Sequence, residues 1–538
     1  MAASAASRRW LGLIALCLGV ALIVVDTTIV NVIVPPLISD LKIDSVQVQW
    51  VQESYPIVLA ALLLLTGRLA DLYGARAVFL TGTAAFTATS VLAALAPAGG
   101  ILILARILQG AAAAMMLPTS LALVNTTFTG ADRGRAFAVW GSTIGVAAAV
   151  GPLLGGALAE FSWRWAFAIN IVIGFLIIVG VRAFLSSSPR SAGRVDFTDA
   201  ALSVLGFGLL AFALIEGRNY GWITVEEPLN ILGIQWSGGP SPVLVALVVA
   251  AVALATFVRR QSALIRRGDE PLMDVRLFSI NSFRNGIITV LIIGLGEFGI
   301  VAVLPLWMQF ALGYSPLQAG LALVPLAAGT FVASVVSLGI AAKVLPLRLV
   351  RTGLVLEIAG LVGLGFVAAP DTSWWSISVA LFVFGVGTGF ATAQIANVIL
   401  AEVPAPSAGR GAAINGTAGQ VGSALGIAVL TTAFFSALGF AMHHRLDAIG
   451  VQGETADRVT DTVTSSAGSA IASLNADPAT AALAHTARAA MADSVSVVGY
   501  LAAGLLVIGL IATALISSGQ PEHVPEPVAG EERQSGRN

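Results

Sequence analysis

Charged residues are scarce in this chain. Asp, Glu, Lys and Arg make up 11% of its 538 residues, whereas a soluble domain carries roughly 25%. This scarcity excludes the hydrated surface of an ordinary soluble protein. The formal net charge is −1, and no basic patch with interleaved aromatic residues occurs, so we expect no nucleic-acid partner.

Cysteine and histidine are almost absent as well. The single cysteine, Cys17, lies inside the first apolar run, which excludes a disulfide framework and a metal site built from cysteines. The four histidines, His443, His444, His485 and His523, lie outside the apolar runs, so no buried zinc or haem site is predicted. An intramembrane enzyme needs a nucleophile–base pair or a metal cluster. We therefore expect no metal, no cofactor and no enzymatic activity.

Two further signals are missing. No phosphate-binding loop of the form GxxxxGK[ST] occurs, so ATP is not expected to be the direct energy source. Arg8 and Arg9 precede the first apolar run, but no small-residue cleavage site follows it before a polar domain. We interpret this run as a retained first span and not as a secretory signal.

Long hydrophobic runs dominate the chain. Hydrophobic residues make up 57% of it, and apolar runs of about 20 residues, the length that crosses a bilayer core, recur from end to end. Each span should be a helix because lipid offers the backbone no other hydrogen-bond partner. The sequence predicts an all-α polytopic membrane protein with about fourteen transmembrane helices. They are expected near 11–36, 51–72, 77–97, 101–125, 136–159, 164–186, 197–216, 242–258, 285–308, 318–340, 346–369, 374–400, 410–440 and 494–516.

The basic residues predict the orientation of these spans. With the N-terminus in the cytoplasm, 21 of the 28 Lys and Arg residues lie on cytoplasmic segments or helix ends, six lie outside, and Arg106 lies within a span. This bias predicts that both termini lie in the cytoplasm. We expect the chain to be a monomer in the inner-membrane bilayer of a bacterial cell. Residues 441–493 are expected to form a long outer loop with helical pieces that cap the outer face. The Pro- and Glu-rich tail 517–538 is expected to be disordered.

The chain repeats itself in two places. "GRAFAVWGSTIGVAAAVGP" begins at Gly134, and "GRGAAINGTAGQVGSALGI" begins 275 residues later at Gly409. "GRLADLYGAR", from Gly67, is echoed 272 residues later by "GIAAKVLPLR", from Gly339. Two echoes at nearly one offset predict two parallel halves, as in many transporters, whose substrate site lies near mid-membrane between the halves. The predicted units are an N-terminal six-helix bundle over 1–190, two inserted helices and a cytoplasmic linker over 191–276, a C-terminal six-helix bundle over 277–516, and the tail.

"GRLADLYGARA", residues 67–77, falls in the short turn predicted between the second and third spans. Gly67 and Gly74 permit close helix approach and a tight turn, and Asp71 and Arg76 can pair across it. Such a pair would latch the cytoplasmic helix ends in one conformation. The alternative is a turn whose charges only set topology. The stretch resembles the loop signature of the major facilitator superfamily, although two of the family's basic positions are uncharged here.

Further motifs extend the resemblance over nearly the whole chain. "RILQGAAAA", with Arg106, is similar to a fourth-span pattern of the superfamily. "DTTIVNVIVPP", which begins at Asp26, resembles the first-span signature of the fourteen-span drug:proton antiporters, and "WRWAFAIN" and "LPLWMQFALGYSPLQAGLALVP" also look like that family. The resemblance implies a major facilitator fold with two additional helices, and multidrug efflux by proton antiport. "AAAVGPLLGG" is similar to an exporter-associated pattern, which implies a conformational gate that includes Gly151, Pro152, Gly155 and Gly156.

Asp26 poses a physical problem. It lies about 15 helical residues into the first span, close to mid-membrane at roughly 1.5 Å per residue. A charge there costs about 2.5–3.5 kcal/mol or more, so the side chain should face the bundle interior or a water-filled cavity. Releasing a proton would create a site for a cation, and capturing one would expel that cation, which is a minimal antiport mechanism. The alternative is an Asp with a purely structural role, satisfied by neighbouring polar groups.

Two more charged residues lie within the spans. Glu297 falls 271 residues after Asp26, nearly the equivalent position of the second half, and two acids facing one cavity would suit a cationic substrate. Arg106 has no basic counterpart in the second half, where Leu381 stands. It is expected to gate protons or to act on a nearby acid, with helix packing as the alternative. We predict Asp26, Arg106 and Glu297 as the proton-coupling residues.

Two further acids lie near the ends of spans. Glu53 is expected to be a hydrated residue near the outer end of its span, with a guard of the outer mouth as the alternative. Glu357 is expected to pair with Arg351 or Arg348.

Polar and aromatic residues within the spans predict a substrate cavity. Together they would line an amphipathic cavity for flat lipophilic cations, although each alone is equally compatible with core packing. The predicted set is Asp26, Asn31, Glu297, Phe298, Trp307, Gln309, Gln394 and Asn415. The leading hypothesis is proton-driven export of small amphipathic, cationic compounds by alternating access. A dedicated exporter of one metabolite, antibiotic, lipid or siderophore is the alternative.

Overall fold

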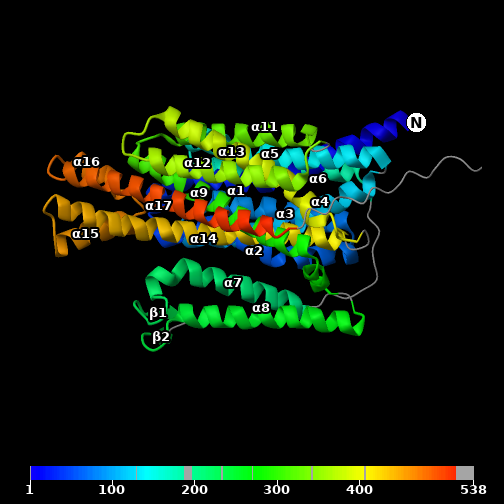
Figure 1. Ribbon diagram of the computed structural model, residues 1–538, viewed down its shortest axis with the longest axis horizontal. Coiled ribbons are helices and arrows are strands. Elements are labelled where there is room, and N and C mark those ends of the chain that lie inside the picture. Colours follow the sequence, from blue (N-terminus) through cyan, green and yellow to red (C-terminus); the bar gives the residue numbers. More distant parts are fainter. Residues whose placement is uncertain are drawn as a thin grey trace, which may run out of the picture.

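The computed structural model describes residues 2–128, 130–186, 197–231, 234–269, 271–340, 343–404 and 408–516. Long helices lie side by side along one axis of the molecule, and a short hairpin lies beside them (Figure 1). The tail 517–538, predicted to be disordered, falls outside the described residues.

The first six long helices form the N-terminal half of the bundle. α1 packs against α4, α5 and α6, while α3 packs against α4 and α6, and α2 packs against α4. Their bounds are α1 Ala2–Leu41, α2 Ser45–Tyr73, α3 Ala75–Ala94, α4 Gly99–Thr127, α5 Gly130–Ala159 and α6 Arg164–Phe184.

The helices after residue 280 form the C-terminal half. α9 packs against α14 and α17, α12 packs against α13 and α17, and α11 packs against α13. A π-helical turn, η2, continues α9 directly after Pro305 and Leu306. The bounds are α9 Asn281–Leu306, η2 Trp307–Ala311, α10 Pro316–Ala322, α11 Val324–Ile340, α12 Pro346–Val367, α13 Trp374–Leu400, α14 Ala408–Ala448 and α17 Ala481–Ala514.

Two helices lie between the halves in sequence and beside the bundle in space (Figure 1). α7 (Phe197–Tyr220) and α8 (Pro242–Arg267) pack against each other. An antiparallel hairpin of β1 (Leu229–Ile231) and β2 (Ile234–Trp236) connects them, and the 3₁₀ turn η1 (Val275–Ser279) leads into α9.

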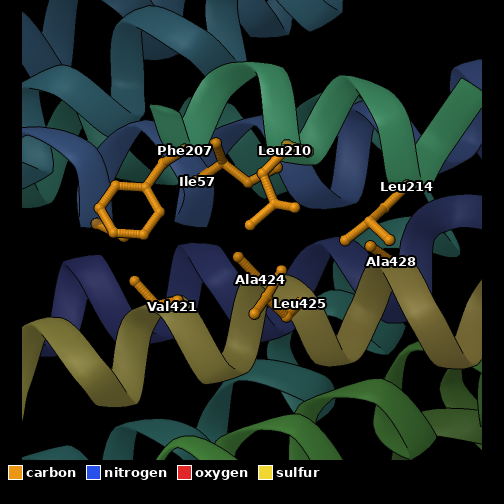
Figure 2. A pocket seen from close by; sticks show the side chains of 10 residues that line it. Ile57, Phe207, Leu210, Leu214, Val421, Ala424, Leu425 and Ala428 are labelled. Atoms are coloured by element: carbon orange, nitrogen blue, oxygen red, sulfur yellow. The ribbon is translucent and has the colours of Figure 1, made fainter. Parts of the chain in front are cut away.

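α7 bridges the seam between the two halves, because it contacts α2 of one half and α14 of the other. Trp50 of α2 donates a hydrogen bond to Glu216 of α7 at 2.7 Å, and Thr432 of α14 donates to the carbonyl oxygen of Leu214 at 3.3 Å. A narrow apolar crevice lies among these three helices (Figure 2). It is lined by Ile57 and Ala60 of α2, by Phe207, Leu210, Ala211 and Leu214 of α7, and by Val421, Ala424, Leu425 and Ala428 of α14.

Thirteen described segments are long and apolar enough to cross a membrane. They include every long helix of the bundle except α2, which has 29 residues and packs inside the bundle against α4 and α14. With α2 added, the thirteen become the fourteen helical segments that the hydropathy pattern predicts. The all-α polytopic fold class is confirmed, and the one hairpin is a local addition to it.

The segment predicted as an outer loop, 441–493, is largely helical. α14 continues to Ala448 and the last long helix begins at Ala481, so "PATAALAHTARAAMADSV" is mostly the first part of α17 and not a separate piece. "ETADRVTDTV" does form a helix, α15 (Glu454–Ser465), and α16 (Ala470–Ala476) follows it. Arg445 of α14 donates to both carboxylate oxygens of Asp493 of α17, at 2.6 and 3.0 Å. These helices project from one end of the bundle (Figure 1).

Local sequence sets several helix ends. α2 begins with a capping box, in which the Asp44 side chain accepts from the backbone N–H of Gln47 at 2.7 Å and the Gln47 side chain accepts from the backbone N–H of Asp44. α10 begins with the same arrangement at Ser315 and Gln318. Both boxes satisfy N–H groups that the first turn of a helix leaves without a partner. α8 ends at Gly268 with φ of 80°, a conformation that glycine adopts without strain.

The two halves meet at one end of the bundle, which we call the α1–α2 end after the connection at residues 42–44. One apolar core runs through both halves there, because Val34 and Leu37 of α1 belong to the same cluster as Leu304 and Trp307. Toward the opposite end, a second cluster contains residues of the N-terminal half alone, all between positions 10 and 185. The cores of the two halves are therefore joined at the α1–α2 end.

Candidate functional site

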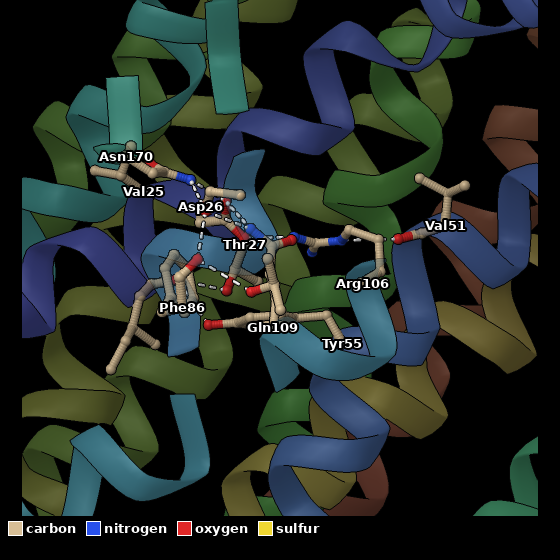
Figure 3. A network of polar contacts seen from close by, with 12 residues as sticks. Val25, Asp26, Thr27, Val51, Tyr55, Phe86, Arg106, Gln109 and Asn170 are labelled. Carbon is tan, nitrogen blue, oxygen red and sulfur yellow. Dashed lines mark hydrogen bonds and ion pairs between the residues drawn. The ribbon is translucent and has the colours of Figure 1, made fainter. Parts of the chain in front are cut away.

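Asp26 lies near the middle of α1 with its side chain completely buried. Asn170 of α6 donates to Asp26 Oδ1 at 2.7 Å, and Gln109 of α4 donates to the same oxygen at 3.5 Å. Arg106 of α4 forms an ion pair with Oδ2. Three helices therefore converge on one carboxylate in the interior of the N-terminal half (Figure 3).

Arg106 is also completely buried and connects more than one helix to Asp26. Its Nη1 donates to Gln109 Oε1 at 3.0 Å, and its Nε donates to the carbonyl oxygen of Val51 of α2 at 3.3 Å. The guanidinium carbon lies 4.4 Å from the centroid of the Tyr55 ring, at the distance of a cation–π contact. Arg106 thus binds α1 and α2 at the same time.

Ser90 of α3 completes the network. Its hydroxyl oxygen accepts from Gln109 Nε2 at 2.8 Å and from Asn170 Nδ2 at 3.3 Å. The sequence prediction contains Asp26 and Arg106 but not Ser90 or Asn170. The signal for Ser90 is an uncharged polar side chain within an otherwise apolar span, which many packing residues share. Asn170 is also the last residue of the family-like motif "WRWAFAIN".

A buried ion pair of this kind constrains the chemistry of both partners. Taking two charges out of water is expensive, and removing one partner of a buried pair typically costs about 3–5 kcal/mol because the other charge is left uncompensated. Protonation of Asp26 would remove its charge and leave Arg106 buried without a counter-ion. Any loss of the Asp26 charge would therefore act on Arg106 and on the helices that Arg106 contacts.

Apart from Asn31 of α1, the other predicted proton and cavity residues lie in the C-terminal half. Glu297 and Phe298 of α9 and Asn415 of α14 are partly buried, and α9 and α14 both contact the N-terminal half. Trp307 of η2 is completely buried. Gln394 of α13 is completely buried too, and its amide donates to the Ser337 hydroxyl of α11 at 2.8 Å. Glu297 and Asp26 are thus not neighbours in one network, since all the described partners of Asp26 belong to the N-terminal half.

Comparison with known sequences assigns the chain to a family. Residues 16–427, more than half of the chain, match the sequence model of the Major Facilitator Superfamily. The chain belongs to this superfamily. Superfamily members carry small molecules across membranes, and the thirteen apolar segments described above agree with a multi-pass transporter.

Curated relatives of this superfamily chain match about four fifths of it. A puromycin resistance protein of Streptomyces alboniger is 35% identical over 79% of this chain and 82% of its own length. A probable actinorhodin transporter of Streptomyces coelicolor is 30% identical over 80% of this chain and 74% of its own length. The multidrug efflux pump LfrA of Mycolicibacterium smegmatis is 31% identical over 80% of this chain and 81% of its own length.

Solved structures agree on the superfamily fold. A bacterial homologue of the human lysosomal transporter Spinster, crystallised in an inward-facing and occupied conformation, superposes with a TM-score of 0.64. The match covers 94% of this chain and 96% of the homologue at 16% sequence identity. At that identity the likeness concerns the fold alone.

Two predicted residues of this superfamily chain join its halves at the α1–α2 end. Gln309 of η2 donates to the carbonyl oxygen of Val32 of α1 at 2.9 Å. Asn31 accepts from Gln52 Nε2 at 3.3 Å, and the same amide donates to the carbonyl oxygen of Ala302 of α9 at 3.3 Å. Asn31 and Gln309 therefore take part in the contact between halves.

The glycines of the exporter-like motif explain how α5 packs at this end. A Cβ on Gly151 would lie 1.9 Å from the Thr28 hydroxyl oxygen of α1, and one on Gly155 would lie 3.0 Å from the carbonyl oxygen of Ile29. A Cβ on Gly156 would lie 2.6 Å from the carbonyl oxygen of Pro316 of α10. From the other side, a Cβ on Gly320 would lie 2.5 Å from the carbonyl oxygen of Pro152. The motif lets backbone touch backbone across the seam.

Only some residues of the loop motif between α2 and α3 have described contacts. Gly74 has φ of 90°, so this turn requires a glycine. A Cβ on Gly67 would meet nothing within 4 Å, so no close helix approach explains that glycine here. Arg76 donates to the carbonyl oxygen of Arg182 at the end of α6, at 3.0 Å. The side chain of Asp71 lies outside the described residues, and the Asp71–Arg76 latch stays a prediction.

Two buried acids differ from their sequence interpretation. Glu53 of α2 and Glu357 of α12 are completely buried, and their carboxylate oxygens have no hydrogen-bond partner among the described residues. The interpretation of Glu53 as a hydrated residue is therefore wrong. The expected pairing of Glu357 with Arg351 is wrong as well, because Arg351 donates instead to the carbonyl and hydroxyl oxygens of Thr513 of α17, at 2.6 and 3.3 Å.

Proposed function

We propose that this chain is a proton-driven exporter of small amphipathic, cationic compounds from the bacterial cytoplasm, working by alternating access. The observation that carries the proposal is the buried Asp26–Arg106 pair, placed in the N-terminal half of a superfamily transporter. The names of the relatives support the substrate class, since they include a puromycin resistance protein and a multidrug efflux pump. Both termini are proposed to be cytoplasmic, on the side opposite the α1–α2 end.

In this mechanism the proton competes with Arg106 for Asp26. The carboxylate already holds the guanidinium, so a substrate cation has no free access to it in this conformation. Protonation from the outer side would release Arg106 and change the packing of α1 against α2 and α4. Proton loss to the cytoplasm would restore the pair and the conformation in which the α1–α2 end is closed.

The substrate site of this mechanism lies along the seam between the halves. Glu297, Phe298 and Asn415 are partly buried on α9 and α14, the helices of the C-terminal half that contact α1 and α2. A carboxylate, an aromatic ring and an amide suit an amphipathic cation, because the ring packs against its flat apolar part and the acid balances its charge.

A dedicated exporter of one antibiotic is the second candidate. Two relatives support it, a probable actinorhodin transporter and a cephamycin export protein. The second is 32% identical over 80% of this chain. A narrow substrate profile would favour this candidate over multidrug export.

The test is ethidium transport into everted membrane vesicles with an imposed, lumen-acid pH gradient. Wild type should accumulate ethidium, and dissipating the gradient should stop it. Asp26→Asn should reduce gradient-driven accumulation at least about tenfold, because the amide cannot exchange a proton and leaves Arg106 without its counter-ion.

Asp461→Asn is the matched control, since Asp461 is an exposed acid of α15 far from the pair. It should transport like wild type. Full gradient-driven transport by Asp26→Asn would overturn the proton role of Asp26. Transport of one antibiotic but not of ethidium by wild type would move the dedicated exporter ahead.

A further inference from the structure

Glu357 is a buried acid without a counter-charge at the middle of a membrane helix. It lies eleven residues into α12, which spans Pro346–Val367, and its side chain is completely buried. Neither carboxylate oxygen has a hydrogen-bond partner in the described structure. An ionised carboxylate in such a place would cost several kcal/mol or more, so the group must be neutral or must hold a cation.

The elements around Glu357 offer it no described positive charge. α13 carries no Asp, Glu, Lys or Arg at all, and the part of α17 after Asp493 carries none either. Arg351, on α12 itself, is bound to Thr513.

Glycine gives the Glu357 side chain its place between helices. A Cβ on Gly387 of α13 would lie 2.4 Å from Glu357 N and 2.8 Å from Glu357 Cγ. α12 and α13 therefore touch backbone to backbone at this level, and the carboxyl group is held inside the C-terminal half. The next residue of α13, Thr388, also has a buried hydroxyl without a hydrogen-bond partner in the described structure. Two buried polar side chains without described partners, Glu357 and Thr388, therefore lie where α12 and α13 touch in the C-terminal half.

Asp26 and Glu357 are held in opposite ways. Asp26 has an arginine and two amides around it, whereas Glu357 is completely buried with no hydrogen-bond partner in the described structure. A carboxyl group without a counter-charge in a low-dielectric interior favours holding a proton.

We propose that Glu357 is a proton-binding residue and forms a second proton site in addition to Asp26. In the conformation described here Glu357 holds the proton as a neutral carboxylic acid. Release of this proton leaves an ionised carboxylate, so it requires a conformational change that gives Glu357 water or a counter-charge. This inference rests on the proposed proton coupling and deepens it, since it adds a proton carrier in the C-terminal half.

The first experiment measures protonation without transport. Purified full-length protein is treated at neutral pH with dicyclohexylcarbodiimide, which reacts with protonated carboxyl groups in apolar surroundings, and the modified residues are located by peptide mass spectrometry. Glu357 should be modified. Glu402, an exposed acid after the end of α13, should not be modified, because it lies in water and not in apolar surroundings. Absence of modification at Glu357 with modification at Glu297 would overturn the proposal.

The second experiment measures coupling with a variant that keeps the side-chain shape. Glu357→Gln should still let ethidium equilibrate across the membrane without a gradient. Its ethidium accumulation driven by the pH gradient should fall at least about tenfold. Glu357→Asp, which restores an acid, should recover part of it. Wild-type accumulation by Glu357→Gln, or a change in KM for ethidium with coupling intact, would overturn the proton role.

The two experiments separate this inference from the proposed function. If wild-type vesicles show no gradient-driven transport, the proposed function fails, while carbodiimide modification still reports whether Glu357 holds a proton. If wild type transports and Glu357→Gln transports equally well, the proposed function stands and the inference fails.

Discussion

Asp26 keeps its place in a membrane helix because other residues supply what water cannot. A carboxylate that receives an arginine and two amide donors has most of its hydrogen-bonding capacity satisfied, so the desolvation cost is offset locally. Glu357 has no such partners in the described structure. The same type of residue therefore leads to two different proposals, an ion pair that a proton breaks and a neutral acid that a proton maintains.

The geometry of Arg106 gives a prediction at this scale. Arg106→Lys keeps the positive charge but loses the planar fork that binds Asp26, Gln109 and the carbonyl oxygen of Val51 together. We expect gradient-driven ethidium transport to fall about tenfold or more, with the protein still folded by thermal unfolding in detergent.

Arg135→Lys is the control for this substitution, because Arg135 is exposed and its ion pair with Asp132 is at the surface. It should leave transport unchanged. If Arg106→Lys transports like wild type, the charge alone suffices and the fork has no role.

At the scale of elements, the small residues of α5 let this helix pack closely against both halves of the molecule. Gly151 and Gly155 let α5 lie directly on α1 within one turn of Asp26, while Gly156 lies on the backbone of α10 in the other half. The same helix therefore contacts the proton-binding helix and the opposite half. A change at the Asp26 pair can reach the seam through this packing without a longer chain of contacts.

This packing predicts the effect of adding a methyl group. Gly156→Ala places a Cβ 2.6 Å from the carbonyl oxygen of Pro316 and 2.8 Å from Leu317 Cα, both backbone atoms that cannot rotate away. The closed α1–α2 end should become less favourable. The measurement is the rate at which a water-soluble maleimide labels Val32→Cys, a completely buried position at this end, in a Cys17→Ser background. We expect labelling to accelerate several-fold.

Gly141→Ala is the matched control on the same helix, because a Cβ there meets nothing within 4 Å. It should leave the labelling rate as it is. Equal labelling rates in the Gly156→Ala and Gly141→Ala backgrounds would show that the contact between α5 and α10 does not hold this end closed.

At the scale of the whole molecule, several hydrogen bonds between the halves lie at the α1–α2 end. The backbone N–H of Leu317 donates to Glu160 Oε1 across the seam at 3.3 Å, and the Gln309 and Gln52 bonds lie at the same end. Alternating access requires these contacts to break once in each cycle. α7 is hydrogen-bonded to both α2 and α14, so its packing must change when the halves move.

A reversible cross-link tests this motion. Glu160→Cys with Leu317→Cys, in the Cys17→Ser background, should react with a short disulfide-cleavable bifunctional thiol reagent. The cross-linked protein should lose nearly all ethidium transport, and reduction should restore it, because the halves can no longer separate at this end.

Asp40→Cys with Arg164→Cys is the comparison pair. These residues form an ion pair of 2.6 Å within the N-terminal half, so a link between them crosses no seam. Transport should survive that link. Loss of transport with both pairs would indicate general damage, and unchanged transport with the first pair would exclude opening at the α1–α2 end.

The sequence by itself determined the kind of molecule and its most conspicuous residues. Apolar runs of bilayer length leave helices as the only structure that satisfies the backbone, so the span pattern and the all-α class follow from composition. Asp26 and Arg106 stand out because charges are costly at that depth. The internal echoes indicated two halves, and the capping residues at Asp44 and Ser315 agree with the observed helix starts. Side of the membrane and proton use stay predictions.

Only the tertiary structure decided which charges meet. Asp26 and Arg106 lie 80 residues apart, and Asn170 lies 144 residues from Asp26, so their contact depends on how α1, α4 and α6 rotate and cross. The same holds for Glu357, which was expected to pair with Arg351 or Arg348. The arginine binds α17 instead, and a glycine of α13 leaves the acid enclosed. Hydropathy reports how deep a residue lies in the membrane, but its partners depend on helix rotation, which packing across the whole bundle sets.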